Sequence, residues 1–154
     1  MNKKINNDYW INIVKEISKA STCRVEIGCV LVHKNLIVGI GYVGSISGDD
    51  HCCDVGCIMV NNHGLKGSGD TGKSCIRTIH AETNAILKCS VRGSEANGWI
   101  ECYSTYSPCL DCTKLLLQIG VRKFIFEKEY KDVNRDIYLD DITLQPSAVW
   151  RLHE

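Results

Sequence analysis

The chain has 154 residues, enough for one domain with a buried core, and its 18 Lys and Arg residues balance its 18 Asp and Glu residues. A net charge of zero with no long basic run argues against a protein that binds a polynucleotide, because such a protein needs a positive surface. The sequence shows neither a signal peptide nor an apolar run long enough to span a membrane, so we expect a cytoplasmic protein without a membrane partner. The 10 cysteines fit reduced side chains, several of them on a metal, better than a secreted disulfide framework.

The predicted elements alternate between helices and strands. In the first part of the chain, periodicity and turn signals predict a helix over about 8–20 with Asp8 as its N-cap, followed by a hairpin of strands 27–33 and 36–42. A helix over 80–90, a strand over 99–104 and a helix from Pro108 to a stop at Gly120 come next. The last predicted elements are a strand over 122–126, a short helix over 133–141 and a strand over 148–152. This order predicts a layered α/β domain with a partly parallel sheet.

Residues 43–79 are the exception to this alternation. They are rich in Gly, Asp, Asn, Ser and Cys and have little hydrophobic periodicity. An irregular stretch of this length is unusual in a compact domain unless it is functional or held in place by a cross-link.

Two short motifs carry the chemistry, His80-x-Glu82 and, downstream, Pro108-Cys109-x-x-Cys112. His-x-Glu followed by Pro-Cys-x-x-Cys is the signature of the zinc-dependent nucleobase deaminases. One His and two Cys give three zinc ligands, and a catalytic zinc keeps its fourth position for water. We expect Glu82 to take a proton from that water and to deliver it to the ring nitrogen and the departing amine.

Each motif taken alone has an ordinary alternative. A Cys-x-x-Cys pair can be a redox motif or half of a structural zinc site, and a His-x-Glu is common by chance. Their joint occurrence in this order, at two predicted helix starts, favours a catalytic zinc over a purely structural one. The positive ends of the two helices would help to keep the cysteines ionised.

Together with their neighbours, these motifs resemble the deoxycytidylate (dCMP) deaminase family, within the zinc-dependent cytidine deaminase superfamily, over about residues 8–128. The segments that carry the resemblance are Ser21–Cys23, Gly39–Tyr42, Gly44–Gly48, His51–Cys52, Gly56–Cys57, Cys75–Ile86, Ser107–Cys112 and Gly120–Lys123. The resemblance implies a three-layer, cytidine-deaminase-like α/β fold with a five-stranded mixed sheet flanked by helices. It also implies a single domain over residues 1–154.

For function, the resemblance implies hydrolysis of dCMP to dUMP and ammonia, which supplies dUMP for thymidylate synthesis. It further implies a homo-oligomer, either a hexamer or a dimer, that is activated by dCTP and inhibited by dTTP. The alternative from another class is a zinc-stabilised binding domain that has lost catalysis. The presence of Glu82 favours the enzyme, because an inactive relative need not keep it.

One departure from the family concerns the nucleotide contacts. The family usually reads Gly-Tyr-Asn-Gly where this chain has Val43 in the Asn position, and that Asn ordinarily hydrogen-bonds the sugar-phosphate part of the substrate. Either the nucleotide is held in another way, or the preferred substrate differs, with dCTP and deoxycytidine as the candidates. Arg24 is either a phosphate ligand or an ordinary surface charge. The other candidate substrate contacts are Ala81, Thr105, Tyr106, Ser107 and Pro108, and Tyr106 either stacks on the base or packs in the core.

A second cluster of cysteines lies in or beside the irregular stretch. Some dCMP deaminases carry a second, structural zinc there, and a closed tetrahedral site would explain how so polar a segment stays ordered. The preferred ligand set is Cys23, Cys52, Cys57 and Cys75, in which Cys53 or His51 could replace a member. The alternative is free or core cysteines. Other expectations place Cys29, Cys89 and Cys102 in the core and His33 and His153 at the surface without partners.

Overall fold

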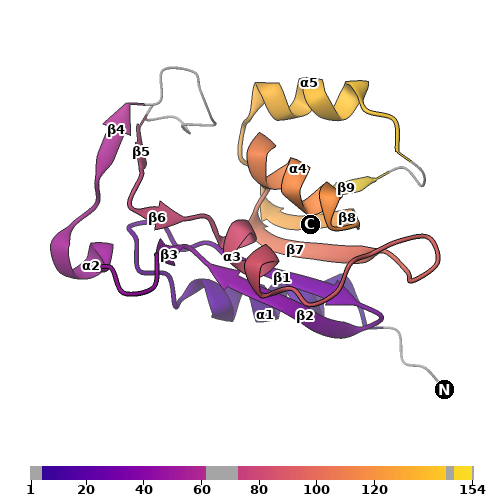
Figure 1. Cartoon of the computed structure of the whole chain (residues 1–154), viewed down its shortest axis with the longest axis horizontal. Coiled ribbons are helices and arrows are strands. Elements are labelled where there is room, and N and C mark those ends of the chain that lie inside the picture. The colour runs from indigo at the N-terminus through magenta and orange to yellow at the C-terminus, as the bar shows by residue number, and fades with distance from the viewer. Residues whose placement is uncertain (1–4, 62–72, 145–147, 154) are drawn as a thin grey trace.

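The computed structural model describes residues 5–61, 73–144 and 148–153, and a five-stranded sheet forms its centre (Figure 1). The strand order is β2-β1-β7-β8-β9. The strands are β1 (Gly28–His33), β2 (Leu36–Tyr42), β7 (Ile100–Tyr106), β8 (Val121–Lys128) and β9 (Val149–Leu152). β1 pairs antiparallel with β2 and β7, whereas β7, β8 and β9 run parallel to one another. The predicted mixed sheet of five strands is therefore confirmed.

Helices cover both faces of this sheet and make three layers (Figure 1). α1 (Asn7–Ser18) packs on one face through Trp10, Ile11 and Val14. α3 (Ala81–Lys88) and α4 (Leu110–Gln118) pack on the other face, and α5 (Val133–Asp141) contacts α4. Successive side chains along each strand point to opposite faces of the sheet, so the sheet packs against both layers of helices.

The stretch over residues 43–79 contains short elements that the sequence did not predict. β3 (Gly44–Ser45) pairs with β6 (Thr78–Ile79), and β4 (Met59–Asn61) pairs with β5 (Lys73–Cys75). α2 (Cys52–Val55) is a single helical turn between them. Within the described residues of 44–79, only Gly44 and Cys52 are buried. Hydrophobic burial therefore contributes little to holding this insertion in place.

The two glycines of β2 let α3 approach the sheet closely. A Cβ atom at Gly41 would lie 2.0 Å from the Ala81 carbonyl oxygen and 2.5 Å from the Ala85 nitrogen. Asn84 then ties the helix to the same strand, because its Nδ2 donates to the Tyr42 carbonyl at 2.9 Å. These contacts fix the start of α3, where His80 is the N-cap residue.

Several element ends differ from the predictions. The N-cap of α1 is Asn6, whose side chain accepts from the Tyr9 amide at 3.1 Å, and Asp8 instead forms an ion pair with His153 at 2.9 Å. The helix expected from Pro108 begins at Leu110, with Cys109 as its N-cap. The stop at Gly120 is as expected, since its φ of +94° suits glycine.

Two expectations about histidines were wrong, whereas the expectation about core cysteines was right. His33 is buried and its Nε2 lies 2.9 Å from the Asn97 carbonyl oxygen, so it has a partner. His153 also has one, in the ion pair just described. Cys29, Cys89 and Cys102 are buried in the core as expected. Among the described residues, no helix has the length and apolar character that crossing a membrane requires.

Candidate active site

The three predicted catalytic-zinc ligands come together at the starts of two helices. His80 is the N-cap of α3, Cys109 is the N-cap of α4, and Cys112 lies in the first turn of α4. His80 Nδ1 lies 3.6 Å from Cys109 Sγ and 3.4 Å from Cys112 Sγ. All three donor atoms lie within 4.8 Å of one another.

This donor set fits a tetrahedral zinc ion. With ordinary Zn–N and Zn–S bond lengths, a tetrahedral ion holds a nitrogen and a sulfur ligand about 3.6 Å apart, and the two observed nitrogen–sulfur distances match that separation. A hydrogen bond from the Cys112 thiol, followed by contact with His80, lowers the pKa of Cys109 to about 4. A site with one imidazole nitrogen and two cysteine sulfur ligands suits zinc and leaves a fourth position for water.

Glu82 lies in the first turn of α3, two residues after His80, and only 5% of its surface is exposed. Burial raises its pKa to about 6, partly offset by the charge of His80. A carboxyl group in such a setting can hold a proton or release it near neutral pH, as a general acid–base group must. The neighbouring Thr83 hydroxyl lies 3.5 Å from Cys112 Sγ, within reach to donate to a thiolate there.

The four cysteines of the preferred second set also come together. Cys23 Sγ lies 3.6 Å from Cys57 Sγ, and Cys52 Sγ lies 3.7 Å from Cys75 Sγ. All four sulfur atoms lie within 4.8 Å of one another, and neither Cys53 nor His51 is part of this group. Sulfur ligands of a tetrahedral zinc are separated by about 3.8 Å, so the cluster has the dimensions of a closed four-thiolate site.

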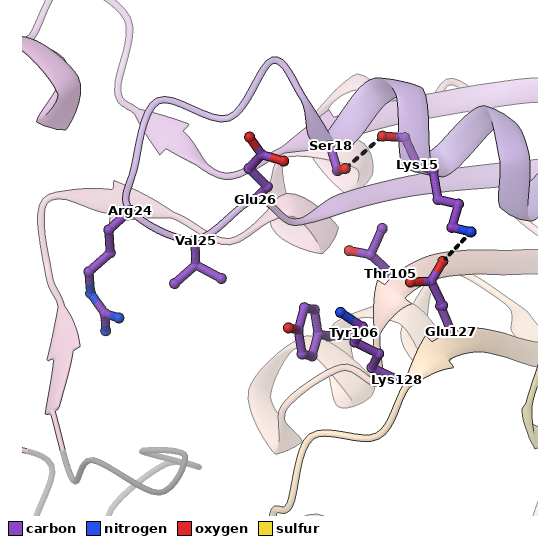
Figure 2. A pocket seen from close by; sticks show the side chains of 9 residues that line it. All are labelled: Lys15, Ser18, Arg24, Val25, Glu26, Thr105, Tyr106, Glu127 and Lys128. Atoms are coloured by element: carbon purple, nitrogen blue, oxygen red, sulfur yellow. Dashed lines mark hydrogen bonds and ion pairs between the residues drawn. The ribbon is translucent and has the colours of Figure 1, made fainter.

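A cavity of about 430 Å³ opens at the carboxyl ends of β7 and β8, beside the loop that follows α1 (Figure 2). Three predicted substrate contacts line it, Arg24, Thr105 and Tyr106, and so do Lys15 and Lys128. Lys15 is paired with Glu127 at 3.1 Å, whereas the Lys128 ammonium lies 5.6 Å from the centre of the Tyr106 ring. The cavity thus offers an aromatic face and cations close to the strand end that leads into the Pro-Cys motif.

The remaining predicted contacts are buried away from this cavity's lining. Val43 is 6% exposed, and its backbone exchanges hydrogen bonds with the loop after α1: its amide donates to Ile27 O and its carbonyl accepts from the Thr22 amide, both at 3.1 Å. Ala81 is 1% exposed and belongs to the core between α3 and the sheet. Ser107 and Pro108 are buried at the start of the Pro-Cys motif and contact Arg135. Their roles in substrate binding stay predictions.

Sequence reasoning missed four residues that the structure brings to the site: Thr83, Lys128, Asp132 and Arg135. Thr83 and Lys128 carry no signal of their own, although Thr83 directly follows Glu82. Asp132 precedes the helix that was predicted over 133–141, so it could have been recognised as an N-cap. The contact of the Asp132 carboxylate with the Leu110 amide, and the contacts of Arg135, depend on tertiary packing.

A His-Cys-Cys cluster at two helix starts, with a buried carboxyl beside it, defines a hydrolytic zinc site of the nucleobase-deaminase class. The chain belongs to the family described as the cytidine and deoxycytidylate deaminase zinc-binding region, whose model matches residues 4–128. This family membership agrees with the resemblance found in the motifs.

Individual relatives share the domain to different extents. ComE operon protein 2 of Bacillus subtilis (strain 168) is 37% identical over 126 residues, which cover 81% of this chain and 60% of that protein. Deoxycytidylate deaminase of Schizosaccharomyces pombe is 28% identical over 80% of this chain, and the chain spans only 37% of its length. Deoxycytidylate deaminase of Enterobacteria phage T4 is 30% identical, over 84% of this chain and 79% of that one.

The fold is that of a solved dCMP deaminase. The crystal structure of the enzyme from cyanophage S-TIM5, in complex with dCMP and dUMP, superposes with a TM-score of 0.70 at 23% sequence identity. The match covers 97% of this chain and 100% of that one. The predicted cytidine-deaminase-like fold is therefore confirmed.

Proposed function

We propose that this chain is a zinc-dependent dCMP deaminase that hydrolyses dCMP to dUMP and ammonia and so supplies dUMP for thymidylate synthesis. The observation that carries the proposal is the convergence of His80, Cys109 and Cys112 next to the buried carboxyl of Glu82. An inactive zinc-stabilised domain would have no need for an acid–base group at that position.

Zinc, when bound by these three ligands, supplies the Lewis acid that makes water nucleophilic near neutral pH. Glu82 takes one proton from the attacking water and delivers it to the ring nitrogen of cytosine. It then assists proton transfer to the exocyclic amine, which leaves as ammonia while the carbonyl of uracil forms. Because Glu82 is 5% exposed, few bulk water molecules compete for this proton.

The nucleotide assignment is supported by relatives and by the cavity. Relatives named deoxycytidylate deaminase match most of this chain, and the solved neighbour holds dCMP and dUMP. In this proposal Arg24 and Lys128 receive the phosphate and the Tyr106 ring faces the base, and all three side chains line the cavity (Figure 2). Another cytosine nucleotide or nucleoside is the second candidate, because the buried, apolar Val43 offers no side-chain hydrogen bond.

Substrate preference can be tested directly. Purified protein is offered dCMP, dCTP, deoxycytidine and CMP separately, and the ultraviolet change from cytosine to uracil is followed. We expect rapid turnover of dCMP. Preference for dCTP or deoxycytidine would move the activity within the superfamily, and no turnover of any substrate, with zinc present and dCTP tried as activator, would favour the inactive binding domain.

We also propose that the chain is one domain whose insertion at 43–79 carries a second, structural zinc on Cys23, Cys52, Cys57 and Cys75. The four sulfur atoms within 4.8 Å of one another support this site. Neighbouring cysteines supply a matched test, because Cys52 is buried in the cluster and Cys53 is exposed outside it. Cys52→Ser should lower the zinc content from two to one per chain and lower the melting temperature, whereas Cys53→Ser should change neither. One zinc per chain in the parent protein would count against the second site.

Assembly into a hexamer or dimer, activation by dCTP, inhibition by dTTP and a cytoplasmic location are the remaining parts of the proposal. Edge strand β2 exposes Leu36, Ile37 and Ile40, which gives a second copy of the chain apolar surface to contact. Light scattering of the purified protein, with and without each nucleotide, measures the assembly state.

A further inference from the structure

The C-terminal helix α5 contacts α4, the helix whose first turn carries two of the three candidate zinc ligands (Figure 1). The family model ends at residue 128, before α5 begins at Val133. Two charged residues of this segment are nevertheless buried, with Asp132 5% and Arg135 0% exposed. Burying a charge is costly unless hydrogen bonds compensate it, so the partners of these two side chains define their role.

Arg135 reaches the loop that carries the Pro-Cys motif. Its Nη1 shares its two N–H groups among three acceptors, Ser107 Oγ at 3.2 Å, the Pro108 carbonyl at 3.0 Å and the Tyr130 carbonyl at 2.7 Å. Its Nε and Nη2 donate to Asp136 Oδ1 at 3.1 and 2.9 Å, and its guanidinium stacks on the Trp150 ring at 4.9 Å. The planar guanidinium can serve partners on several sides at once, which a lysine ammonium cannot reproduce.

Asp132 caps two helices with one carboxylate. Its Oδ1 accepts from the Arg135 amide at 3.0 Å, as the N-cap of α5. Its Oδ2 accepts from the Leu110 amide at 2.8 Å, at the first residue of α4. The start of α4 has no cap from Cys109, its own N-cap residue, because that side chain points to the metal cluster.

We propose that Asp132 and Arg135 are positioning residues that fix the backbone on both sides of Cys109. Arg135 holds the carbonyl of Pro108, the residue before Cys109, and Asp132 holds the amide of Leu110, the residue after it. With both peptide groups fixed, Cys109 Sγ stays at its 3.6 Å separation from His80 Nδ1. The inference rests on the proposed function in taking Cys109 as a zinc ligand. Groups that orient ligands in this way typically change metal affinity or activity 10–100-fold.

Two conservative variants isolate this role. Asp132→Asn keeps one acceptor oxygen for the cap of α5, but its amide group cannot also accept from the Leu110 amide. Arg135→Lys keeps the charge but cannot contact the Pro108, Tyr130 and Asp136 oxygens together. Asn6→Ala is the control, because it removes a cap of the same kind from α1, on the other face of the sheet.

The measurement is the rate of zinc release to a coloured chelator from the fully loaded protein, together with the melting temperature, kcat and KM. Zinc release should show two phases, one for each proposed zinc site. The phase that is missing in His80→Ala belongs to the candidate catalytic site. We expect that phase to be at least tenfold faster in Asp132→Asn and Arg135→Lys, with unchanged release from the four-cysteine site. In Asn6→Ala, both release rates should equal those of the parent.

Where the chosen nucleotide is turned over, kcat should fall in both variants with little change in KM, because neither residue lines the cavity proposed for the nucleotide. The proposal would be overturned if both variants released zinc at the parental rates and lost no more melting temperature than Asn6→Ala does. If Arg135→Lys does not fold, Asp132→Asn decides the question alone. A parent protein that turns over no nucleotide would contradict the proposed function, yet the release comparison would still test this inference.

Discussion

At the scale of single residues, Glu82 separates catalysis from metal binding. It is buried in the first turn of α3 but is not one of the three donor residues of the candidate metal cluster. Glu82→Gln keeps the size and hydrogen-bonding capacity of the side chain and removes its ability to carry a proton. We expect turnover to fall on the order of a thousandfold, which is typical for loss of a general acid–base group. Zinc content, measured by atomic emission on the same sample, should stay that of the parent.

Thr83→Val is a useful comparison for this variant because it changes the next residue without removing an acid–base group. Its hydroxyl lies near Cys112 Sγ, so the substitution should weaken a contact to a ligand rather than abolish proton transfer. If Glu82→Gln turns over substrate within a few-fold of the parent rate, the proposed role of Glu82 in proton transfer is wrong.

The cations of the cavity make a second prediction at this scale. Arg24 and Lys128 lie on its rim from two different parts of the chain, the loop after α1 and the end of β8 (Figure 2). If they receive the phosphate, Arg24→Ala and Lys128→Ala should each raise KM for dCMP about tenfold, in line with loss of one hydrogen bond to a charged group. The KM for deoxycytidine, which has no phosphate, should not change.

Arg151→Ala supplies the control, because Arg151 is an exposed cation on β9 that does not line the cavity. Equal effects on dCMP and deoxycytidine would show that the two cations act through the shape of the cavity and not through the phosphate.

The sequence predicted which residues approach one another where they belong to recognisable motifs, and it missed contacts that no motif marks. His80, Glu82, Cys109 and Cys112 form two compact motifs, so their approach to one another could be expected from sequence. The contact between Asp132 and Leu110 belongs to no such motif. Its existence depends on how α5 lies against α4, which the periodicity of neither segment specifies.

At the scale of elements, the position of the zinc-binding helix depends on a glycine. Gly41→Ala would place a methyl group 2.0 Å from the Ala81 carbonyl oxygen, which is backbone and cannot rotate away. α3 would have to move off β2, and we expect a loss of about 3 kcal/mol or more in the free energy of unfolding, at the upper end for overpacking. Turnover should fall as well, because His80 and Glu82 move with the helix. Urea unfolding measures the first effect.

Gly44→Ala is the matched control for this prediction. Its methyl group would meet the Thr22 hydroxyl oxygen at 3.3 Å, a side-chain atom that can shift by a few tenths of an ångström. We expect it to cost less than 1 kcal/mol, as small adjustments usually do. A Gly41→Ala protein as stable as Gly44→Ala would contradict the close packing of α3 on the sheet.

Most elements of the three-layer core could be predicted, because each carries several apolar residues, either at helical spacing or in a β-rich run bounded by turn residues. The insertion could not, because β3 and β6 have two residues each and β4 and β5 have three. Elements this short carry no measurable period. Two of the short elements, α2 and β5, carry members of the four-cysteine cluster, which the sequence did bring together as a candidate ligand set.

At the scale of the whole molecule, the sheet and the insertion owe their order to different forces. The central sheet is buried by helices on both faces, and large apolar residues such as Leu31, Phe124 and Ile125 have no exposed surface. The described part of the insertion leaves Ile58, Met59 and Ile76 exposed and buries little besides Val43 and Cys52. The core can therefore fold through hydrophobic burial, whereas for the insertion we propose that the second zinc supplies the missing cross-link through its four cysteines.

This division predicts that removing zinc will have two separable consequences. The candidate catalytic cluster sits on α3 and α4, whose residues Ala81, Ala85 and Leu116 belong to the core, so these helices should keep their packing without the metal. Loss of that zinc should abolish turnover while lowering the melting temperature by only a few degrees. Loss of zinc from the four-cysteine cluster should lower the melting temperature much more, because a closed four-thiolate site binds its ion more tightly and the insertion has little hydrophobic burial to keep it folded without the metal.

Stepwise dialysis against a chelator, with zinc content, turnover and melting temperature measured on each sample, tests this separation. The open three-ligand site should lose its ion first, since a closed set of four thiolates binds zinc more completely. We therefore expect an intermediate with one zinc per chain that is inactive but nearly as stable as the parent, and turnover should return when zinc is added back. Turnover and melting temperature that decline in parallel from the first sample would mean that both ions serve one cooperative structure, and the core would then depend on metal as the insertion does.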